Sequence, residues 1–265
     1  MLTERTLPPR YEIRTLTREH IAWANAIIMH STAFASPVWS RLYPDNKTRL
    51  CYDLFRHSDY LVSHAVASGL SLGIFDTQYT FQHADSDAAG GKLHWDLDDT
   101  GSGAGEADLV RQMDFPLLSV ALAFDAFNQI DAARLAPLVG VMPLLADRNR
   151  ILSARDGRDP GAREATGPGQ VALRNSTATK AGEEGKGFMG HLARQMMRRL
   201  AGMGFRGVQI QCLHDSVHRV WSRPPAPFRA EVVARFHCSE DGDGEVRRLF
   251  KGSVQEVTKV YVSLR

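Results

Sequence analysis

The sequence predicts an α/β protein, a single domain in which helices flank a mixed central β-sheet. Segments with the two-residue period of a strand alternate with segments of helical period along the 265 residues. Towards the C-terminus, a strand-like run leads through a glycine-rich turn into an amphipathic helix and a further strand. The apolar fraction of 43% is enough for a normal core. A chain of this length forms one large domain or two small ones, and we predict one.

The first elements are a strand and two helices. Tyr11 to Leu16 has strand character, and Thr17 can cap the helix that follows. The apolar stripe of that helix is Ile21, Ala24, Ile27 and Ile28. Asp45 or Asn46 can cap a second helix. The inward residues of this second helix are Leu50, Leu54, Leu61 and Val62.

The middle of the chain mixes strands with loops. A second strand is predicted over Leu70 to Ile74 and a third over Gly90 to Trp95. Asp96 to Glu106 is acidic and rich in glycine, which indicates a loop. The run Leu117 to Phe124 is apolar throughout, and periodicity leaves it open between a buried strand and part of a helix. Asp131 to Leu145 is predicted to be helical, limited by its prolines.

The last elements follow a loop over Arg155 to Gly169. A strand over Leu173 to Ala178 precedes the glycine-rich turn and its helix. The apolar stripe of that helix is Phe188, Leu192, Met196, Leu200 and Met203. The next strand alternates at Val208, Ile210 and Cys212. Two closing strands are predicted, over Ala230 to Phe236 and Val257 to Leu264.

The junction between the glycine turn and the helix can hold an anionic phosphate. The first helical N–H groups have no intrahelical partner, and the helix dipole is positive there. Two common nucleotide motifs are excluded. Gly187 is followed by Phe188 rather than by a Lys-Ser or Lys-Thr pair, and no GxGxxG after a strand is accompanied by an acidic residue in the expected place. The alternative is a surface turn before a core helix.

The residues of this junction resemble a known family. Glu184-Gly185-Lys186-Gly187-Phe188-Met189, the helix behind it and Gly204-Phe205-Arg206-Gly207 are similar to the acyl-CoA-binding core of the GNAT superfamily of N-acetyltransferases. The close resemblance covers roughly Gln170 to Phe228, and the order of elements matches more loosely over most of the chain. It implies one GNAT-like domain over residues 1–265, with an insertion and loops over 77–169 and the acyl-CoA-binding core over 170–228.

The resemblance implies acetyl-CoA as co-substrate and no metal. In the family, backbone amides of the pattern Arg/Gln-x-x-Gly-x-Gly/Ala bind the pyrophosphate, and the preceding strand pairs with the pantetheine arm. By position, the coenzyme-binding residues are Asn175, Ser176, Thr177, Gly185, Lys186, Gly187, Phe188, Met189 and Gly190. Glu184 stands where Arg or Gln is usual, and Met189 stands where Gly or Ala is usual. A carboxylate near a pyrophosphate is repulsive by about 1 kcal/mol or more.

Catalysis of this type needs a polarised thioester carbonyl, a deprotonated amine and a stabilised thiolate. The resemblance implies that backbone N–H groups of the strand before the turn polarise the carbonyl. It also places Trp221 where the family has a tyrosine acid, and an indole N–H is no useful proton source near neutral pH.

Three titratable residues near this position, His214, Asp215 and His218, are the candidate catalytic cluster. The two histidines are one helical turn apart if a helix starts there, and histidine titrates near neutral pH. In the alternative, Asp215 only caps the helix and both histidines lie on the surface. A metal site at these histidines lacks an evident third ligand.

The resemblance thus implies an acyl-CoA-dependent N-acyltransferase that acetylates an amine, with a small molecule as the expected acceptor. Glu184, Met189 and Trp221 favour the alternative, a GNAT-like protein without acetyltransferase activity that runs a different reaction in the same cleft or only binds a ligand or partner. We expect a monomer or homodimer.

Composition sets further expectations. The net charge of +2, with no basic run that interleaves aromatics, argues against a nucleic-acid partner. No apolar run reaches the ~20 residues of a membrane span, so no membrane partner is expected. The three scattered cysteines suit a reducing compartment, and Met1 to Arg10 does not have the pattern of a signal peptide. We therefore predict a cytoplasmic protein.

Overall fold

The main element of the fold is a seven-stranded sheet. The computed structural model describes residues 6–98 and 103–265, with the backbone alone at Ala162. The strand order is β1-β2-β5-β6-β7-β9-β8, and every neighbouring pair is antiparallel except β6–β7. The strands are β1 (Tyr11–Thr15), β2 (Leu72–Asp76), β5 (Leu117–Asp125), β6 (Val171–Thr179), β7 (Gly207–Cys212), β8 (Arg229–His237) and β9 (Glu256–Ser263). This confirms the predicted mixed sheet in one α/β domain.

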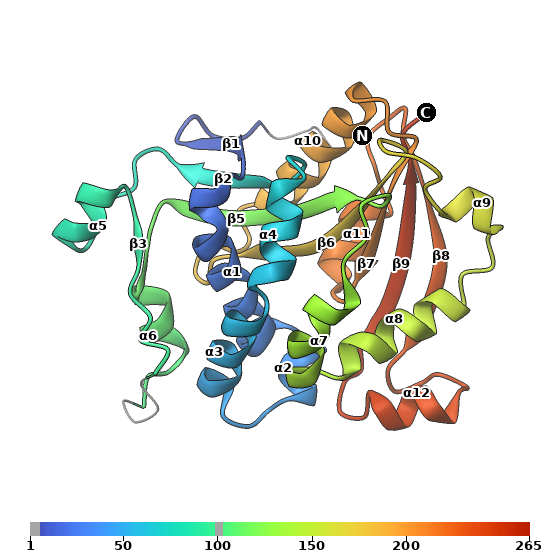
Figure 1. Cartoon of the computed structure of the whole chain (residues 1–265), viewed down its shortest axis with the longest axis horizontal. Coiled ribbons are helices and arrows are strands. Elements are labelled where there is room, and N and C mark those ends of the chain that lie inside the picture. Colours follow the sequence, from blue (N-terminus) through green and yellow to red (C-terminus); the bar gives the residue numbers. More distant parts are fainter. Residues whose placement is uncertain (1–5, 99–102) are drawn as a thin grey trace.

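Helices cover both faces of the sheet (Figure 1). One face packs against α1 (Ile21–His30), α3 (Lys47–His57), α4 (Asp59–Ala67), α7 (Ala132–Val141) and α8 (Leu144–Ala154). The other face packs against α10 (Phe188–Gly202) and α11 (Asp215–Trp221). Each face has its own hydrophobic cluster, so the sheet is buried between two helical layers.

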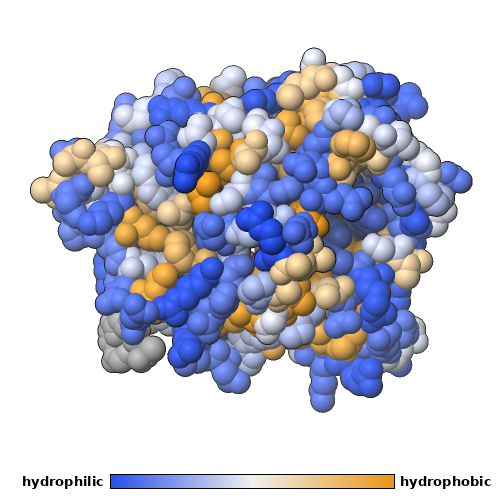
Figure 2. All heavy atoms as spheres, in the orientation of Figure 1, coloured by the Kyte–Doolittle hydropathy of each residue, from blue (hydrophilic) through white to orange (hydrophobic). Residues whose placement is uncertain are grey.

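Short elements complete the chain. They are the turns η1 (Arg18–His20) and η2 (Ser31–Ala35), helices α2 (Trp39–Leu42), α5 (Ala84–Ala89), α6 (Glu106–Arg111), α9 (Pro160–Arg163) and α12 (Gly244–Leu249), and a two-stranded sheet of β3 (Lys92–Leu93) and β4 (Met113–Asp114). On the face that Figure 2 shows, apolar side chains reach the surface in patches among hydrophilic ones. Among the helices of the described residues, none is long and apolar enough to cross a membrane.

The apolar run that periodicity left open is the strand β5. It lies between β2 and β6, and its first eight residues are buried. Helices cover both faces of the sheet here, so the side chains on both faces of β5 are apolar. The two-residue alternation of hydrophobicity that marks a half-exposed strand is therefore absent. The predicted third strand at Gly90 to Trp95 is reduced to β3, outside the main sheet, since Gly90 and Gly91 have positive φ and form a turn.

Two predicted helices are each divided in two. The second helix is interrupted at Ser58 into α3 and α4, and Asn46 rather than Asp45 caps it. The helix predicted over Asp131 to Leu145 is also two helices, because Pro143 becomes the N-cap of α8. The loop predicted over Asp96 to Glu106 lies in part outside the described residues, at 99–102, and ends in α6.

Candidate functional site

The central strands β6 and β7 separate about halfway along β6. They pair only over Val171–Arg174 and Gly207–Ile210, whereas β6 continues to Thr179 beside β5, and β7 stays paired with β9. A register shift accompanies the separation: Ala121 faces Thr177 while Ala123 faces Arg174, so β6 carries an extra residue there. Within residues 6–98 and 103–265, residues 175–179 therefore have no strand partner on their β7 side.

The guanidinium of Arg174 supports this bulge from inside the protein. Its Nη1 donates to the carbonyl oxygen of Leu122, at 2.7 Å, and to that of Ser176. Burial lowers the pKa of Arg174 to about 9. The guanidinium carbon lies 5.9 Å from the ring centroid of Trp221, which is fully buried. Trp221, which the resemblance places where a tyrosine is expected, thus belongs to the core and not to the cleft described next.

A cleft of about 1330 Å³ opens where the two strands separate. Its floor is the free edge of β6, and its two ends differ in chemistry. One end is polar and is formed by the glycine turn, the start of α10, and α11 with the residues after it. The other end is mainly apolar and is lined by Ile28, Met29, Leu54, Leu61, Ile130, Leu135, Leu138, Val139, Met142 and Leu145. The cleft can therefore hold a charged group at one end and an apolar group at the other.

The polar end contains an open helix N-terminus. Gly182, Gly185 and Gly187 have φ of 86°, 77° and 81°, a region that favours glycine. Gly187 is the N-cap of α10, and among the described residues no side chain caps this helix. The first intrahelical bond is donated by the N–H of His191 to Gly187, which leaves the three N–H groups of residues 188–190 beside the cleft. These donors suit an anion.

The sequence reasoning placed nine coenzyme-binding residues on this junction, and the structure brings them together. Asn175, Ser176 and Thr177 line the cleft along β6, and the six residues from Gly185 to Gly190 line its polar end. Four basic residues that the motif did not reveal join them, namely His191, Arg194, Arg219 and Arg223. Their sequence signal is a set of cations on the two helices that follow the turn and, for Arg223, just after the second of them.

Two described lining residues at this end, Glu183 and Glu184, oppose an anion, and Glu184 stands in the motif itself. The Oε2 of Glu184 accepts a hydrogen bond from the backbone N–H of Gly182, at 2.7 Å, so the carboxylate folds back onto the turn. Beside it, Lys186 donates to Glu183 at 2.5 Å. Two hydrogen-bond donors of the turn, the N–H of Gly182 and the ammonium group of Lys186, are thus already paired with carboxylates of the same turn.

Replacing Glu184 by Gln is expected to tighten acetyl-CoA binding by about fivefold, because one negative charge leaves the anion site while the amide oxygen can still accept from Gly182. Calorimetric titration at low salt measures this effect, and added salt should reduce it. Glu240→Gln, at an exposed glutamate outside the cleft lining, is the matched control. If E184Q and the parent protein bound acetyl-CoA with equal affinity, the pyrophosphate would not lie beside the glycine turn.

The three candidate catalytic residues lie in different surroundings. His214 lines the cleft and is the N-cap of α11, where its Nδ1 accepts from the N–H of Ser216 at 3.0 Å. Asp215, which the alternative reading made the cap, instead accepts from Gln255 at 2.5 Å. The Nδ1 of His218 lies 2.9 Å from Oγ1 of Thr258. Asp215 and His218 are not among the residues that line the cleft.

A π-helical turn shapes the cleft opposite β6. In η2 the N–H of Ser36 bonds to the carbonyl of Ser31, five residues back, and Ser31, Thr32 and Ser36 line the cleft. Such turns are frequent at functional sites. Sequence reasoning missed this one, because a single widened turn leaves the period of α1 almost unchanged.

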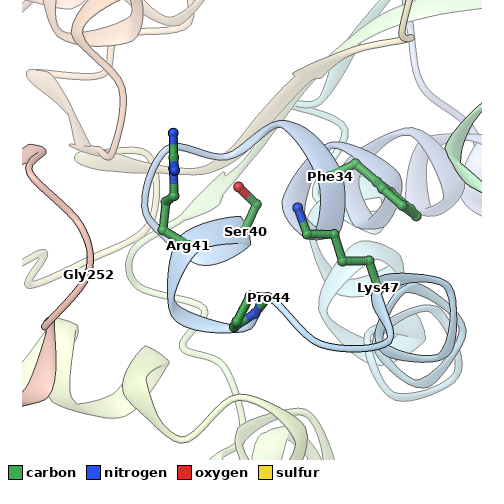
Figure 3. A pocket seen from close by; sticks show the side chains of 6 residues that line it. All are labelled: Phe34, Ser40, Arg41, Pro44, Lys47 and Gly252. Carbon is green, nitrogen blue, oxygen red and sulfur yellow. The ribbon is translucent and has the colours of Figure 1, made fainter.

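Two other groupings lie outside the cleft. A shallower hollow of about 510 Å³, lined by Phe34, Ser40, Arg41, Pro44, Lys47 and Gly252, shares no lining residue with it (Figure 3). His83, His94 and Asp114 have potential metal-ligand atoms within 4.8 Å of one another. However, Asp114 already accepts from the N–H groups of Gln82 and His83, so its carboxylate closes the loop before α5.

Comparison with known proteins finds a similar fold among solved structures. No protein-family model and no curated protein sequence matches the chain. Among solved structures, it resembles the C-terminal condensation domain of Ebony in complex with beta-alanyl-dopamine, at 15% identity and a TM-score of 0.57 over 95% of this chain and 97% of that one.

Two N-acetyltransferases from insects are similar in the same way. Arylalkylamine N-acetyltransferase 2 from Aedes aegypti matches at 11% identity and a TM-score of 0.56, over 96% of this chain and 99% of that one. The polyamine N-acetyltransferase of Drosophila melanogaster matches at 11% identity and a TM-score of 0.52, over 95% and 98%. The chain thus has the GNAT fold in a divergent form, over nearly its full length.

Proposed function

We propose that this protein is an acyl-CoA-dependent N-acyltransferase that transfers an acetyl group from acetyl-CoA to a small-molecule amine. The observation that carries the proposal is the separation of β6 from β7, which opens a cleft that ends at the uncapped N-terminus of α10. The similar insect structures, named as arylalkylamine and polyamine N-acetyltransferases, support it.

The hydrogen-bond donors and positive charges of the cleft match the groups that an acyl-CoA presents. The N–H groups of residues 188–190 would hold the pyrophosphate, and the free edge of Asn175 to Thr177 would hold the pantetheine arm. Lys186, Arg219 and Arg223 add positive charge to the same end. Residues 170–228 are thus the proposed coenzyme-binding core. When bound, an acyl-CoA supplies an activated thioester.

His214 is the proposed catalytic residue, since among the three candidates it alone lines the cleft. Its Nδ1 accepts a hydrogen bond from a backbone N–H, so the neutral ring carries its proton on Nε2. That Nε2–H can donate a hydrogen bond into the cleft and stabilise a departing thiolate. Asp215 and His218 are proposed to position His214, because they hold α11 against Gln255 and Thr258.

The insertion and loops over residues 77–169 are proposed to form much of the acceptor wall. Helices α7 and α8 supply Leu135, Leu138, Val139 and Leu145 to the apolar end of the cleft, and Ile130 and Met142 flank these helices. An apolar wall excludes water, and a water-free site strengthens the hydrogen bonds that stabilise a developing charge.

Thiol release tests the function. The protein is incubated with acetyl-CoA and a panel of primary amines, and free thiol and the mass of the acylated amine are measured. Acetylation that requires both components supports the proposal. Binding of acetyl-CoA without transfer to any amine would favour the alternative, a GNAT-like protein that only binds in this cleft or runs another reaction there. Glu184 on the turn and Trp221 in the core are the observations that favour this alternative.

A further inference from the structure

The apolar end of the cleft, where the acceptor amine is proposed to bind, is called the acceptor end. Its described lining residues include no carboxylate. The acidic residues in the described part of the lining are Glu183 and Glu184, and both belong to the glycine turn at the other end. A diamine or polyamine needs an acidic partner for its second ammonium group, because an unpaired charge in an apolar wall is costly. This end of the cleft is therefore poorly suited to a polycation.

A cation occupies the same wall. Arg148, on α8, lines the cleft beside Asn149, and its guanidinium carbon lies 5.6 Å from the ring centroid of the buried Trp39. Burial lowers the pKa of Arg148 to about 10. The aromatic face offsets part of the loss of water around the charge.

Among the residues that the structure describes, none supplies an anionic partner for the guanidinium of Arg148. Its Nε and Nη2 share one acceptor, Oδ1 of Asn149, at 3.3 and 3.0 Å. Among the described residues, no carboxylate lies within ion-pair distance and Nη1 has no hydrogen-bond partner. Arg150, two residues further along the same helix, contrasts with it, since it pairs with Asp147 at 3.1 Å and Glu245 at 2.8 Å.

We propose that Arg148 binds a carboxylate of the acceptor, so that the acceptor class is an amine that carries a carboxylate on an apolar body. The proposal rests on the proposed function. A planar guanidinium with free N–H groups binds a carboxylate in a bidentate manner, and such a pair is stronger where water is scarce. The apolar side chains of α7 and α8 then enclose the body of the acceptor. Arg148 selects the acceptor but takes no part in the chemical step.

Binding without chemistry tests the proposal. 3-Phenylpropionate, which has the carboxylate but no amine, and phenethylamine, which has the amine but no carboxylate, are titrated into the full chain by calorimetry. We expect the carboxylate to bind to the parent protein, with affinity reduced at least about tenfold in Arg148→Gln and less in Arg148→Lys. Arg150→Gln, at a paired surface arginine, should bind like the parent protein.

Thermal unfolding separates recognition from a structural role. The unliganded R148Q protein should unfold at the same or a higher temperature, because the substitution removes a desolvated charge without a counter-ion. Equal 3-phenylpropionate binding by R148Q and the parent protein, or tighter binding of phenethylamine, would overturn the proposal. So would an R148Q protein with a lowered melting temperature, or one that loses affinity for coenzyme A itself, since the anion would then belong to the coenzyme.

The two proposals fail in different ways. Carboxylate binding through Arg148 without thiol release from acetyl-CoA would leave the acceptor site in place and refute the transfer reaction. Thiol release that is equally fast with matched amines and their amino-acid counterparts would refute the role of Arg148 and leave the transfer reaction in place.

Discussion

Gly187→Asp is expected to abolish acetyl-CoA binding, with a loss of affinity on the order of 100-fold or more. The substitution puts a carboxylate directly before the three open N–H groups of α10, where the pyrophosphate would lie. Two charges about 4 Å apart near a protein surface interact by about 4 kcal/mol, and the sign here is repulsive. The new side chain also competes for the same helix N-terminus, because Asp is a good N-cap.

The matched control for this variant is Gly182→Asp. Gly182 belongs to the same turn, has a similar φ of 86° against 81° at Gly187, and does not line the cleft. A Cβ at either glycine meets no atom within 4 Å, so both variants carry the same backbone strain without a clash. Calorimetry should give near-parent affinity for G182D and none for G187D. Equal loss in both variants would mean that strain in the turn, and not an anion site, explains the effect.

His214→Ser is expected to lower the rate of acetyl transfer by about 100-fold while the affinity for acetyl-CoA stays unchanged. Serine is itself a preferred N-cap, so the variant keeps α11 capped and removes the imidazole that lines the cleft, together with its proposed Nε2–H donor. The effect should therefore appear in kcat. Steady-state kinetics of thiol release, together with a calorimetric titration, measures both quantities.

His218→Asn is the matched control for the second histidine of α11. His218 contacts Thr258 of β9 and does not line the cleft, and an Asn amide can keep the hydrogen bond to Thr258 that positions α11, so this replacement should change the rate by less than about threefold. A reversed pattern, with a fast H214S variant and a slow H218N variant, would transfer the catalytic role to His218.

The sequence predicted most of the sheet and misjudged elements where periodicity carries little information. Alternation located β1 and β7, because one face of each strand is more exposed than the other. The strand β2 is buried throughout, and its alternation arises from Gly73 between Leu72 and Ile74. The run that became β5 has no such alternation, since both of its faces are buried in the middle of the sheet. Short elements such as β3 depend on turns and tertiary contacts, which local pattern does not encode.

The candidate site was only half visible in the sequence. The glycine turn could be located, because positive φ requires glycine and the helix behind it has a clear stripe. The acceptor end could not, since Arg148, η2 and α7 are distant in sequence and meet only in the folded chain. Likewise, three neighbouring titratable residues looked like one cluster, but the helix start turns His214 towards the cleft and His218 towards β9.

Titration of acetyl-CoA into the full chain, followed by calorimetry, tests the central claim most directly. The proposal predicts saturable binding of one coenzyme per chain, and competition by coenzyme A that lacks the acetyl group. It also predicts that the heat disappears in G187D and remains in G182D. An absence of binding at millimolar acetyl-CoA, in a protein shown to be folded by a cooperative thermal transition, would contradict an acyl-CoA site in the cleft between β6 and β7.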